Sequence, residues 1–355
     1  MPLITKTDSS GFVNDLEDVY KLTKFNWEHL SLNKEATRLS EREMKKDPMN
    51  LKYPHVGFKW NKGDFEVEYW ITQAITSLRS DNHKYVVVSW HYEPDQDSDN
   101  TSGVDKGVRL SFVNVTDMDK ISYRHVLLVR KSVDNPKEYP VFEPVPIHAG
   151  GLATAGSKIY VADTYNGFRV FDVNMIFQVN EDESKQKCGI VNGKPYGFNY
   201  LYVMPEVERY TLDQHEADFS FCSIDNSDEN NPLLFTGNYR KDDSETGIIS
   251  WWRLQNDEIS TREALVMDST SSPLPLKTQG ALSYKSKLWF SCSGDKKLKT
   301  STRDSTYHWY DFTEYDWPSG CEDLHYSTTS GNLWCNSEFA DMRYVWAVKL
   351  EDYCP

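Results

Sequence analysis

The chain has 355 residues, of which 39% are hydrophobic and 14% aromatic, and its formal net charge is −15. This length suits one large β-domain or two ordinary domains, and an acidic surface repels phosphate backbones, so nucleic acid is not expected as a partner. No segment approaches the roughly 20 apolar residues of a membrane span. A small-molecule substrate is the partner class that fits, and the sequence does not give the oligomeric state.

Residues 1–63 differ in composition from the rest of the chain and are rich in Glu, Lys and Leu. They predict an irregular N-terminal extension that wraps the following domain and contains one short helix at 39–44. Residues 1–6 contain no apolar signal core. If the protein is secreted, as argued below, its signal peptide would have been removed before Met1.

From residue 64 onward the pattern changes to short strands separated by turn residues. The runs 85–90, 108–113 and 125–130 are rich in β-branched or alternating apolar residues. Strands of this length indicate an all-β sandwich, barrel or propeller, so residues 64–355 are predicted to form one β-domain.

An internal repeat selects the propeller. Each copy has a first strand of small residues, a tight turn and a second strand with an aromatic residue, as in the pair 151–161 and 280–290. The innermost strands of a propeller crowd the axis and favour small residues, so the repeat predicts five blades. The copies begin near Gln73, His148, Asp218, Gln279 and Glu322. The last copy is short of a strand, which residues 65–70 would supply, and a sixth blade would have to come from the N-terminal region.

The six cysteines and two sequons point to an oxidising compartment. The chain contains no C-x-x-C pair, so a zinc site is not expected. The even count of cysteines allows up to three disulfide bonds, whose pairing the sequence does not give. Asn100 and Asn114 begin the sequons Asn-Thr-Ser and Asn-Val-Thr. We therefore expect a secreted or secretory-lumen glycoprotein with most cysteines oxidised.

Side chains at the starts of the blades are expected to face one funnel, where titratable groups can exchange protons. His148 and Glu322 are the predicted catalytic pair, because the repeat places them on the same strand face. The alternatives are a structural histidine bonded to a neighbouring blade, and a carboxylate that caps a turn or pairs with Arg343. The predicted substrate-binding residues are Gln73, Trp90, Tyr200, Asp218, Gln279 and Asp323.

Trp90 and Tyr200 belong to a wider set of aromatic residues able to stack a ligand, although packing between blades also explains such residues. The other members are His91, Tyr196, Phe198, Tyr202, Trp251 and Trp252. Asp163 and Arg169 flank an Asn-Gly turn, so a structural role at this hairpin is predicted for them. The acidic run 95–99 lacks the glycine of a calcium loop. No metal and no cofactor is predicted, and standard nucleophile or phosphate-binding motifs are absent.

Three sequence runs resemble a family of secreted propeller-like proteins of actinomycetes and filamentous fungi. They are 146–151 (PIHAGG), 159–164 (IYVADT) and 167–172 (GFRVFD), and the resemblance extends from about Trp70 to the C-terminus. Among fungal members it implies a hetero-Diels–Alderase of tropolone–sesquiterpenoid biosynthesis. Such an enzyme dehydrates a hydroxymethyl tropolone to a quinone methide, which adds to a humulene-type terpene in the funnel, without a cofactor. No catalytic motif of that family transfers to particular residues of this chain.

Two other functions remain open, because propellers host many activities. A carbohydrate-active enzyme, either a glycosidase or a lyase, would use two carboxyl groups, for which Glu322 and Asp218 are the available pair. A sugar-binding propeller would use the aromatic residues without a titratable pair. A mainly apolar funnel would favour the cycloaddition, and a polar funnel would favour the carbohydrate-active enzyme.

Overall fold

The computed structural model describes residues 4–100, 103–132, 141–212, 219–268 and 272–354, and these are nearly all in strands, turns and loops. The α-helices are short: α1 (Ser10–Asp18), α2 (Glu41–Met44) and α3 (Lys62–Glu66). Three single 3₁₀ turns follow at Trp27–His29, Pro94–Gln96 and Leu350–Tyr353. No helix in the described part of the chain is both long and apolar enough to cross a membrane.

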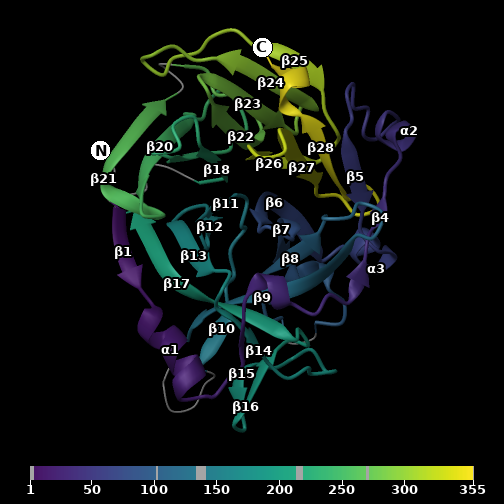
Figure 1. Ribbon diagram of the computed structural model, residues 1–355, viewed down its shortest axis with the longest axis vertical. Coiled ribbons are helices and arrows are strands. Elements are labelled where there is room, and N and C mark those ends of the chain that lie inside the picture. The colour runs from purple at the N-terminus through teal and green to yellow at the C-terminus, as the bar shows by residue number, and fades with distance from the viewer. Residues whose placement is uncertain (1–3, 101–102, 133–140, 213–218, 269–271, 355) are drawn as a thin grey trace.

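Each of the five repeat copies forms an antiparallel hairpin. The first strands of these hairpins are β6 (Trp70–Arg79), β11 (Leu152–Ala155), β18 (Phe221–Asp225), β22 (Thr278–Tyr284) and β26 (Cys321–Ser327). Figure 1 shows these five strands around the middle of the molecule, with later strands further out. Contacts run from β6 to β11, β11 to β18, β18 to β22, β22 to β26 and β26 back to β6. The first strands therefore form a ring, and the arrangement is propeller-like.

The first two repeat copies share one large curled sheet. Its central order is β11-β12-β13-β17-β9-β8-β7-β6, and β17 pairs with β9 in parallel. The additional strands are β7 (Lys84–Tyr92), β8 (Val108–Asn114), β9 (Ser122–Lys131), β10 (Phe142–Pro144), β12 (Lys158–Asp163), β13 (Gly167–Asp172), β14 (Ile176–Gln178) and β17 (Tyr202–Leu212). A separate hairpin, β15 (Cys188–Val191) and β16 (Lys194–Gly197), projects beyond this sheet.

The other three copies build separate antiparallel sheets. One contains β18, β19 (Leu233–Gly237), β20 (Ile248–Gln255) and β21 (Glu258–Asp268). The next contains β22, β23 (Lys287–Cys292), β24 (Lys297–Thr302) and β25 (Thr313–Asp316). The last contains β26, β27 (Asn332–Ser337) and β28 (Tyr344–Lys349), and the N-terminal region completes it.

The sequence predicts that residues 65–70 supply the strand that extends the last sheet, but another segment does so. β5 (Val56–Lys59) pairs with β28, and β4 (Thr37–Arg38) pairs with β5. Phe65 instead lies in α3, which begins at the side-chain cap that Asn61 provides, and Trp70 opens β6. The predicted short helix near residue 40 is present as α2, whose capping box joins Ser40 and Glu43.

Other N-terminal strands extend the large sheet. They are β1 (Ile4–Asp8) against β17, β2 (Lys24–Phe25) against β14, and β3 (Lys34–Glu35) against β9. Since each of these strands adds to the edge of an existing sheet, the N-terminal residues cover edges that would otherwise expose unpaired backbone groups.

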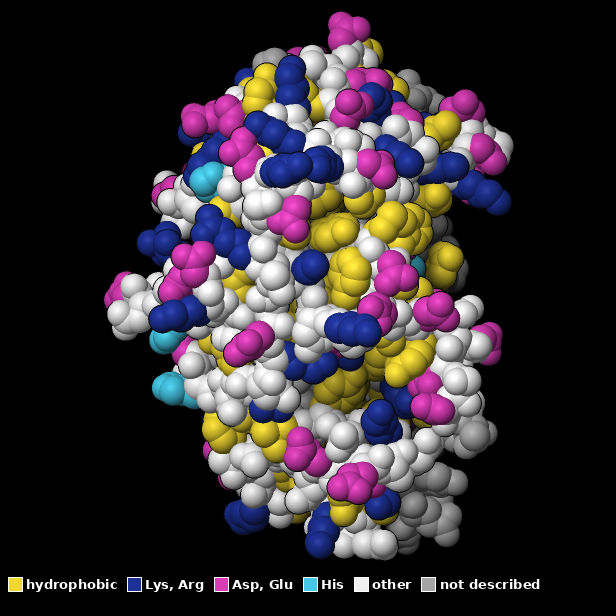
Figure 2. All heavy atoms as spheres, turned by 90° about the vertical axis from the view of Figure 1, so that its right-hand side faces the viewer, with side chains coloured by type: hydrophobic (Ala, Val, Ile, Leu, Met, Phe, Trp, Pro, Cys, Tyr) yellow, Lys and Arg dark blue, Asp and Glu magenta, His cyan; other side chains and the backbone are white. Residues whose placement is uncertain are grey.

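The hydrophobic core lies between neighbouring sheets. Trp90 and Trp334, for example, belong to one buried cluster between the large sheet and the last sheet. Tyr160 and Trp252 belong to another, between the large sheet and the β18–β21 sheet. The aromatic content of the sequence is thus used largely for packing between sheets, where large rings bury the most apolar surface. On the face shown in Figure 2, acidic and basic side chains are interspersed, so the net negative charge is not gathered there in one patch.

The centre of the ring is closely packed. A Cβ atom on Gly280 would lie 2.4 Å from the Cα of Asp323, and one on Gly151 would lie 2.3 Å from the backbone nitrogen of Cys222. Only residues without a side chain allow backbones to approach so closely. The small residues of the repeat therefore bring the first strands into direct contact.

Asp323 joins three of these strands at a point where its side chain is fully buried. Its carboxylate accepts hydrogen bonds from the backbone nitrogens of Leu152 (3.1 Å) and Leu324 (2.9 Å), and the Ile75 backbone also bonds to it. Burial raises the pKa of Asp323 well above its usual range, while these hydrogen bonds act in the opposite direction. The expected substrate-binding role is not favoured by this position, because the carboxylate connects β26 with β11 and β6.

All six cysteines are free thiols, so the expectation of disulfide bonds is wrong for this structure. Cys222, Cys292, Cys321 and Cys335 are fully buried, where free cysteine behaves as a small hydrophobic residue. The even number of cysteines predicted pairing because the sequence does not reveal which thiols pack as core residues.

We expect Asp323→Ala to lower the free energy of unfolding by about 2–4 kcal/mol, because the buried backbone donors of Leu152 and Leu324 would lose their acceptor. Asp323→Asn keeps one acceptor oxygen and should cost less. Urea unfolding followed by circular dichroism measures both effects, with the exposed Asp81→Ala as a control expected to change stability by at most ~0.5 kcal/mol. If Asp323→Ala behaved like the control, the carboxylate would not hold the strands together.

Candidate functional site

Matching irregularities in three first strands form the candidate site. The antiparallel register shifts between Thr72 and Ile75 in β6, between Thr278 and Gly280 in β22, and between Cys321 and Leu324 in β26. Such bulges redirect a side chain out of the regular alternation of a strand. The residues within them include Gln73, Gln279 and Glu322, which are predicted from the sequence to face the funnel.

These residues form one group with Glu338, and we call Gln73, Gln279, Glu322 and Glu338 the axial cluster. Gln279 donates a hydrogen bond from Nε2 to Oε1 of Glu322 at 3.1 Å. Gln73 bonds to the side chain of Glu338, and the charge of Glu338 acts on Glu322. Gln73 and Glu322 are each 1% exposed, whereas Gln279 and Glu338 are partly exposed. Two members of the cluster are therefore buried, and the other two are partly accessible to solvent.

Burial raises the pKa of both glutamates of the cluster. Burial, then the charges of Glu338 and Asp323, raise the pKa of Glu322 well above its usual range. Burial also raises the pKa of Glu338, but the guanidinium of Arg343 acts in the opposite direction. Glu322 is therefore the better proton donor of the pair and Glu338 the member that ionises more readily, since desolvation and neighbouring charges set the two apart.

Several buried polar atoms near these bulges lack a partner within the protein. Oε1 of Gln73 and both side-chain amide atoms of Asn336 have no hydrogen-bond partner in the described structure. Asn336 is fully buried in β27, opposite the bulge of β26. Unpartnered buried polar groups are costly, so they indicate a place for water or for the hydroxyl or amide groups of a ligand.

His148, the other predicted catalytic residue, lies in a different setting. Its ring packs against His91 at a centroid distance of 4.6 Å, at a cavity of about 530 Å³ that Asp163 and Arg169 also line. The contacts of Glu322 are instead with the axial cluster. The expected shared strand face fails because β11 begins only at Leu152, and Ala149 has a positive φ of 58° that breaks strand alternation.

Asp163 and Arg169 behave as the scaffold that the sequence suggested. Nε of Arg169 donates to Asp163 at 2.8 Å, and Nη1 donates to Glu206 at 2.6 Å. All three side chains are buried. The two carboxylates compensate the charge of the buried guanidinium, and their hydrogen bonds fix the turn between β12 and β13.

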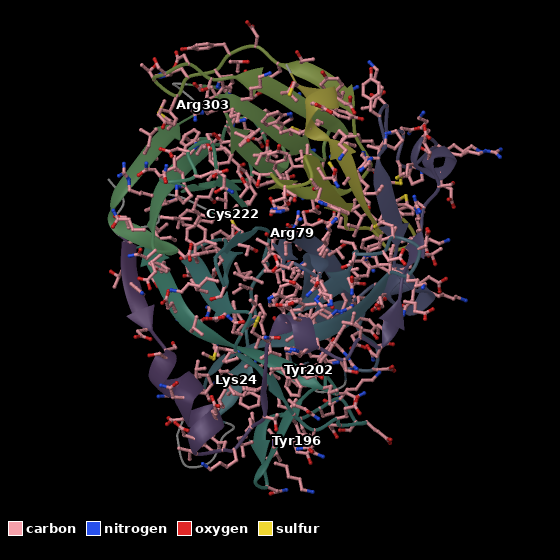
Figure 3. The ribbon with its side chains drawn as sticks, viewed as in Figure 1. Lys24, Arg79, Tyr196, Tyr202, Cys222 and Arg303 are labelled. Atoms are coloured by element: carbon pink, nitrogen blue, oxygen red, sulfur yellow. The ribbon has the colours of Figure 1, made fainter. Side chains whose placement is uncertain are left out.

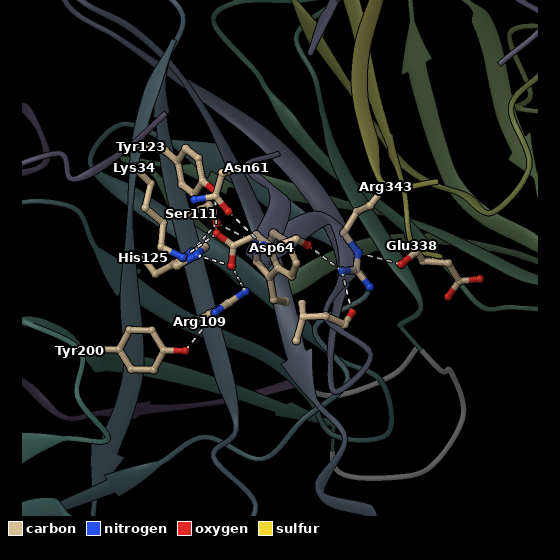
Figure 4. A network of polar contacts seen from close by, with 12 residues as sticks. Lys34, Asn61, Asp64, Arg109, Ser111, Tyr123, His125, Tyr200, Glu338 and Arg343 are labelled. Carbon is tan, nitrogen blue, oxygen red and sulfur yellow. Dashed lines mark hydrogen bonds and ion pairs between the residues drawn. The ribbon is translucent and has the colours of Figure 1, made fainter. Parts of the chain in front are cut away.

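Tyr200 belongs to a second polar group, drawn in Figure 4, which we call the Asp64 network: Lys34, Asp64, Arg109, Ser111, Tyr123, His125 and Tyr200. Asp64 accepts hydrogen bonds from Lys34 (2.6 Å), Tyr123 (2.6 Å) and Arg109 (3.1 Å). Arg109 also donates to the hydroxyl of Tyr200 at 3.1 Å. Trp90 is fully buried beneath Arg109, so it supports this network and does not face an open funnel.

Within the network, Ser111, His125 and Asp64 form a chain of hydrogen bonds that resembles a hydrolytic triad. Ser111 lies 2.8 Å from Nδ1 of His125, and Nε2 of His125 lies 3.1 Å from Asp64. Ser111 is, however, fully buried and accepts a hydrogen bond from the indole of Trp90. Burial, then Arg109, lower the pKa of His125 to about 3. A neutral histidine beside an inaccessible hydroxyl gives a structural chain and not a nucleophile.

Arg343 connects the two groups. Nη1 donates to the backbone oxygen of Asp64 at 2.8 Å, and Nε donates to the backbone oxygen of Glu338 at 2.9 Å. The alternative in which Arg343 pairs with Glu322 is not found, because these donors are directed to backbone oxygens. No local sequence motif marks Asp64, Arg109 or Glu338, because their partners are distant in the chain.

The remaining predicted residues are spread over the molecule. Figure 3 places Tyr196 and Tyr202 well away from Cys222, which lies near the middle of the ring. Trp251 and Trp252 are buried in two separate clusters. Asp218 lies outside the described residues. The aromatic residues therefore do not assemble into one stacking surface.

The two sequons differ in their settings. Asn100 is 8% exposed and its side-chain nitrogen donates to the backbone oxygen of Val104, which does not favour a glycan there. Asn114 is partly exposed at the end of β8, and its glycosylation stays a prediction. Among the residues that the structure describes, no group of three or more His, Cys, Asp or Glu side chains is placed to hold a metal ion.

The histidine pair predicts a pH dependence of stability. Burial lowers the pKa of His91 to about 4 in the folded protein, below its value of about 6.5 in the unfolded chain. The neutral ring therefore contributes stability above pH ~6.5, and this contribution falls as the pH drops toward the folded value. When the pH falls from 7 to 4.5, the free energy of unfolding should decrease by about 2 kcal/mol less in His91→Gln than in the unsubstituted protein.

Urea unfolding at the two pH values measures this difference, because groups shared by both proteins cancel. The exposed His29→Gln provides the matched control and should keep the pH dependence of the unsubstituted protein. An identical pH dependence in His91→Gln would mean that His91 titrates normally in the folded state.

Comparison with known proteins gives no family. Neither the known family profiles nor the curated proteins gave a match. Among solved structures, the chain is similar to the GH43_1 enzyme from Xanthomonas citri, with 13% sequence identity, a TM-score of 0.41, and coverage of 79% of this chain and 88% of that chain. A chain of the nidogen/laminin complex matches with 8% identity, a TM-score of 0.35 and coverage of 81% and 83%. Likenesses as loose as these carry no argument about the activity of this chain.

Proposed function

We propose that the protein is a carbohydrate-active enzyme that acts on a hydroxylated substrate at the axial cluster, with Glu322 as the proton donor. The observation that carries this proposal is the pairing of two glutamates, both with raised pKa values, beside amide side chains that have unpartnered buried atoms. The proposal includes the five-bladed reading, in which each first strand opens one blade and the large sheet holds the first two.

The chemistry of glycoside cleavage fits this arrangement. A protonated Glu322 would give its proton to the leaving oxygen as the C–O bond at the anomeric carbon breaks. Glu338, as a carboxylate, would either take a proton from the attacking water or bond to the anomeric carbon before water displaces it. In both routes one water is consumed: its oxygen and one hydrogen form the new hydroxyl at the anomeric carbon, and its other hydrogen returns to Glu322, directly or by way of Glu338.

The amide groups of the cluster support a sugar over an apolar substrate. Gln73, Gln279 and Asn336 each offer both a donor and an acceptor, which matches the hydroxyl groups of a carbohydrate. The hetero-Diels–Alder reaction needs two apolar partners held in register, and a polar cluster gives it less support. A sugar-binding protein without turnover is the remaining alternative, and it is separated by the same experiment.

We expect the protein to hydrolyse at least one member of a panel of 4-methylumbelliferyl glycosides, with release of the fluorescent phenol as the readout. Glu322→Gln should lower kcat by about 10²–10⁴-fold, because general acid–base groups contribute in this range. Glu338→Gln should lower turnover of the same glycoside, and the exposed Glu351→Gln serves as the matched control.

Binding of sugars without any turnover would replace the proposal with the sugar-binding alternative. Full activity in both Glu322→Gln and Glu338→Gln, with the fold intact by circular dichroism, would place the chemistry elsewhere. Turnover of a hydroxymethyl tropolone with a humulene-type alkene, and of no glycoside, would restore the cycloaddition reading.

A further inference from the structure

A second cavity lies over the Asp64 network and away from the axial cluster. Its volume is about 550 Å³, and Asp64, Arg109, His125 and Tyr200 form part of its wall. Trp70 and Phe198 add apolar surface to the same wall. Ligand cavities commonly combine such apolar walls with a few fixed polar groups. The axial mechanism proposed above uses none of the side chains in this wall.

The floor of this cavity holds more positive than negative charge. Lys34 and Arg109 share the single carboxylate of Asp64. Asp97 and Lys106, which also line the cavity, form their own ion pair at 3.0 Å. His125 adds no charge, because its ring is neutral at physiological pH. Two positive charges therefore share one carboxylate in this wall; the Arg109 side chain is 5% exposed and the Lys34 side chain 30% exposed.

Buried charges in proteins are normally compensated, because desolvation makes an uncompensated charge costly. Burial and the neighbouring charge of Arg109 lower the pKa of Lys34, while Asp64, which Arg109 also uses, acts in the opposite direction. An anion bound in the cavity would supply the missing charge.

Arg109 shows how the floor is held in place. Its guanidinium lies 4.5 Å from the ring centroid of Trp70 and 4.4 Å from that of Trp90. The side chain is buried, and its Nε has no hydrogen-bond partner in the described structure. Two aromatic rings and two hydrogen bonds thus fix a cation whose donors are not all used.

The outer wall carries charges of both signs. Asp99, Glu181 and Glu183 line the mouth and are exposed, as is Lys185. Arg124 is partly exposed there, with Nε donating to the backbone oxygen of Ser31. Solvent and salt screen exposed charges much more than buried ones. The floor therefore decides the preferred charge of an occupant more than the mouth does.

We propose that this cavity binds an organic anion, a carboxylate attached to a planar apolar group. The carboxylate pairs with Lys34 beside Arg109, while the ring lies against the aromatic wall formed by Trp70, Phe198 and Tyr200. This site is independent of the axial cluster, so failure of the proposed carbohydrate activity leaves it unaffected.

Isothermal titration of the full chain with 2-naphthoate, its uncharged amide 2-naphthamide, and inorganic phosphate tests the proposal. 2-Naphthoate should bind at least about tenfold more tightly than the amide, and phosphate should bind more weakly than 2-naphthoate. Lys34→Met should weaken 2-naphthoate binding by at least about tenfold, and Arg109→Lys should weaken it as well because the fork geometry is lost.

Exposed Lys241→Met is the matched control and should bind 2-naphthoate as the unsubstituted protein does. Arg124→Met, at the mouth, provides a second variant if Lys34→Met fails to fold by circular dichroism, and it should weaken binding in the same direction. Absent binding of 2-naphthoate, equal binding of the amide, phosphate binding as tight as that of 2-naphthoate, or unchanged affinity in the folded variants would each overturn the proposal.

Discussion

The close approach of five first strands around one axis is the constraint on which the rest of the structure depends. Glycines at the contacts let backbone meet backbone, as at Gly280 and Gly151, and the carboxylate of Asp323 then binds amides of neighbouring strands. A carboxylate buried so completely is tolerated because backbone donors surround it. The sheets that start from these strands radiate outward and bury aromatic side chains between them.

The same crowding determines where chemistry is available. The bulges in β6, β22 and β26 interrupt the regular alternation of side chains, and the polar residues Gln73, Gln279 and Glu322 lie within them. There the low local dielectric strengthens each interaction and raises the pKa of a carboxyl group that lacks a cation. Arg343 lies between this cluster and the Asp64 network, so two polar groups with opposite charge preferences share one positioning residue.

The repeat made much of the architecture predictable, because small residues followed by a turn and an aromatic strand are local features. The first strands and the residues Gln73, Gln279 and Glu322 at their starts follow from it directly. His148 was placed wrongly relative to Glu322, since a positive φ at Ala149 interrupts the alternation that the argument assumed. Sequence reasoning could not find Asp64, Arg109 and Glu338, because the residues that bond to them or surround them lie far away in the chain. The disulfide prediction failed for the same reason: pairing depends on distance in space, which cysteine counting does not provide.

The pairing of β5 with β28 has a consequence for how the chain reaches its native state. Gly57 lies opposite Trp346, so β5 cannot pair, and the ring cannot close, until β28 has also been synthesised. Contacts between residues so distant in sequence are slow to form, because a long loop must be ordered first. Until then the apolar faces of the first and last sheets stay uncovered. The nascent protein is therefore exposed to aggregation until β28 has been made, and assistance by chaperones would matter most up to that point.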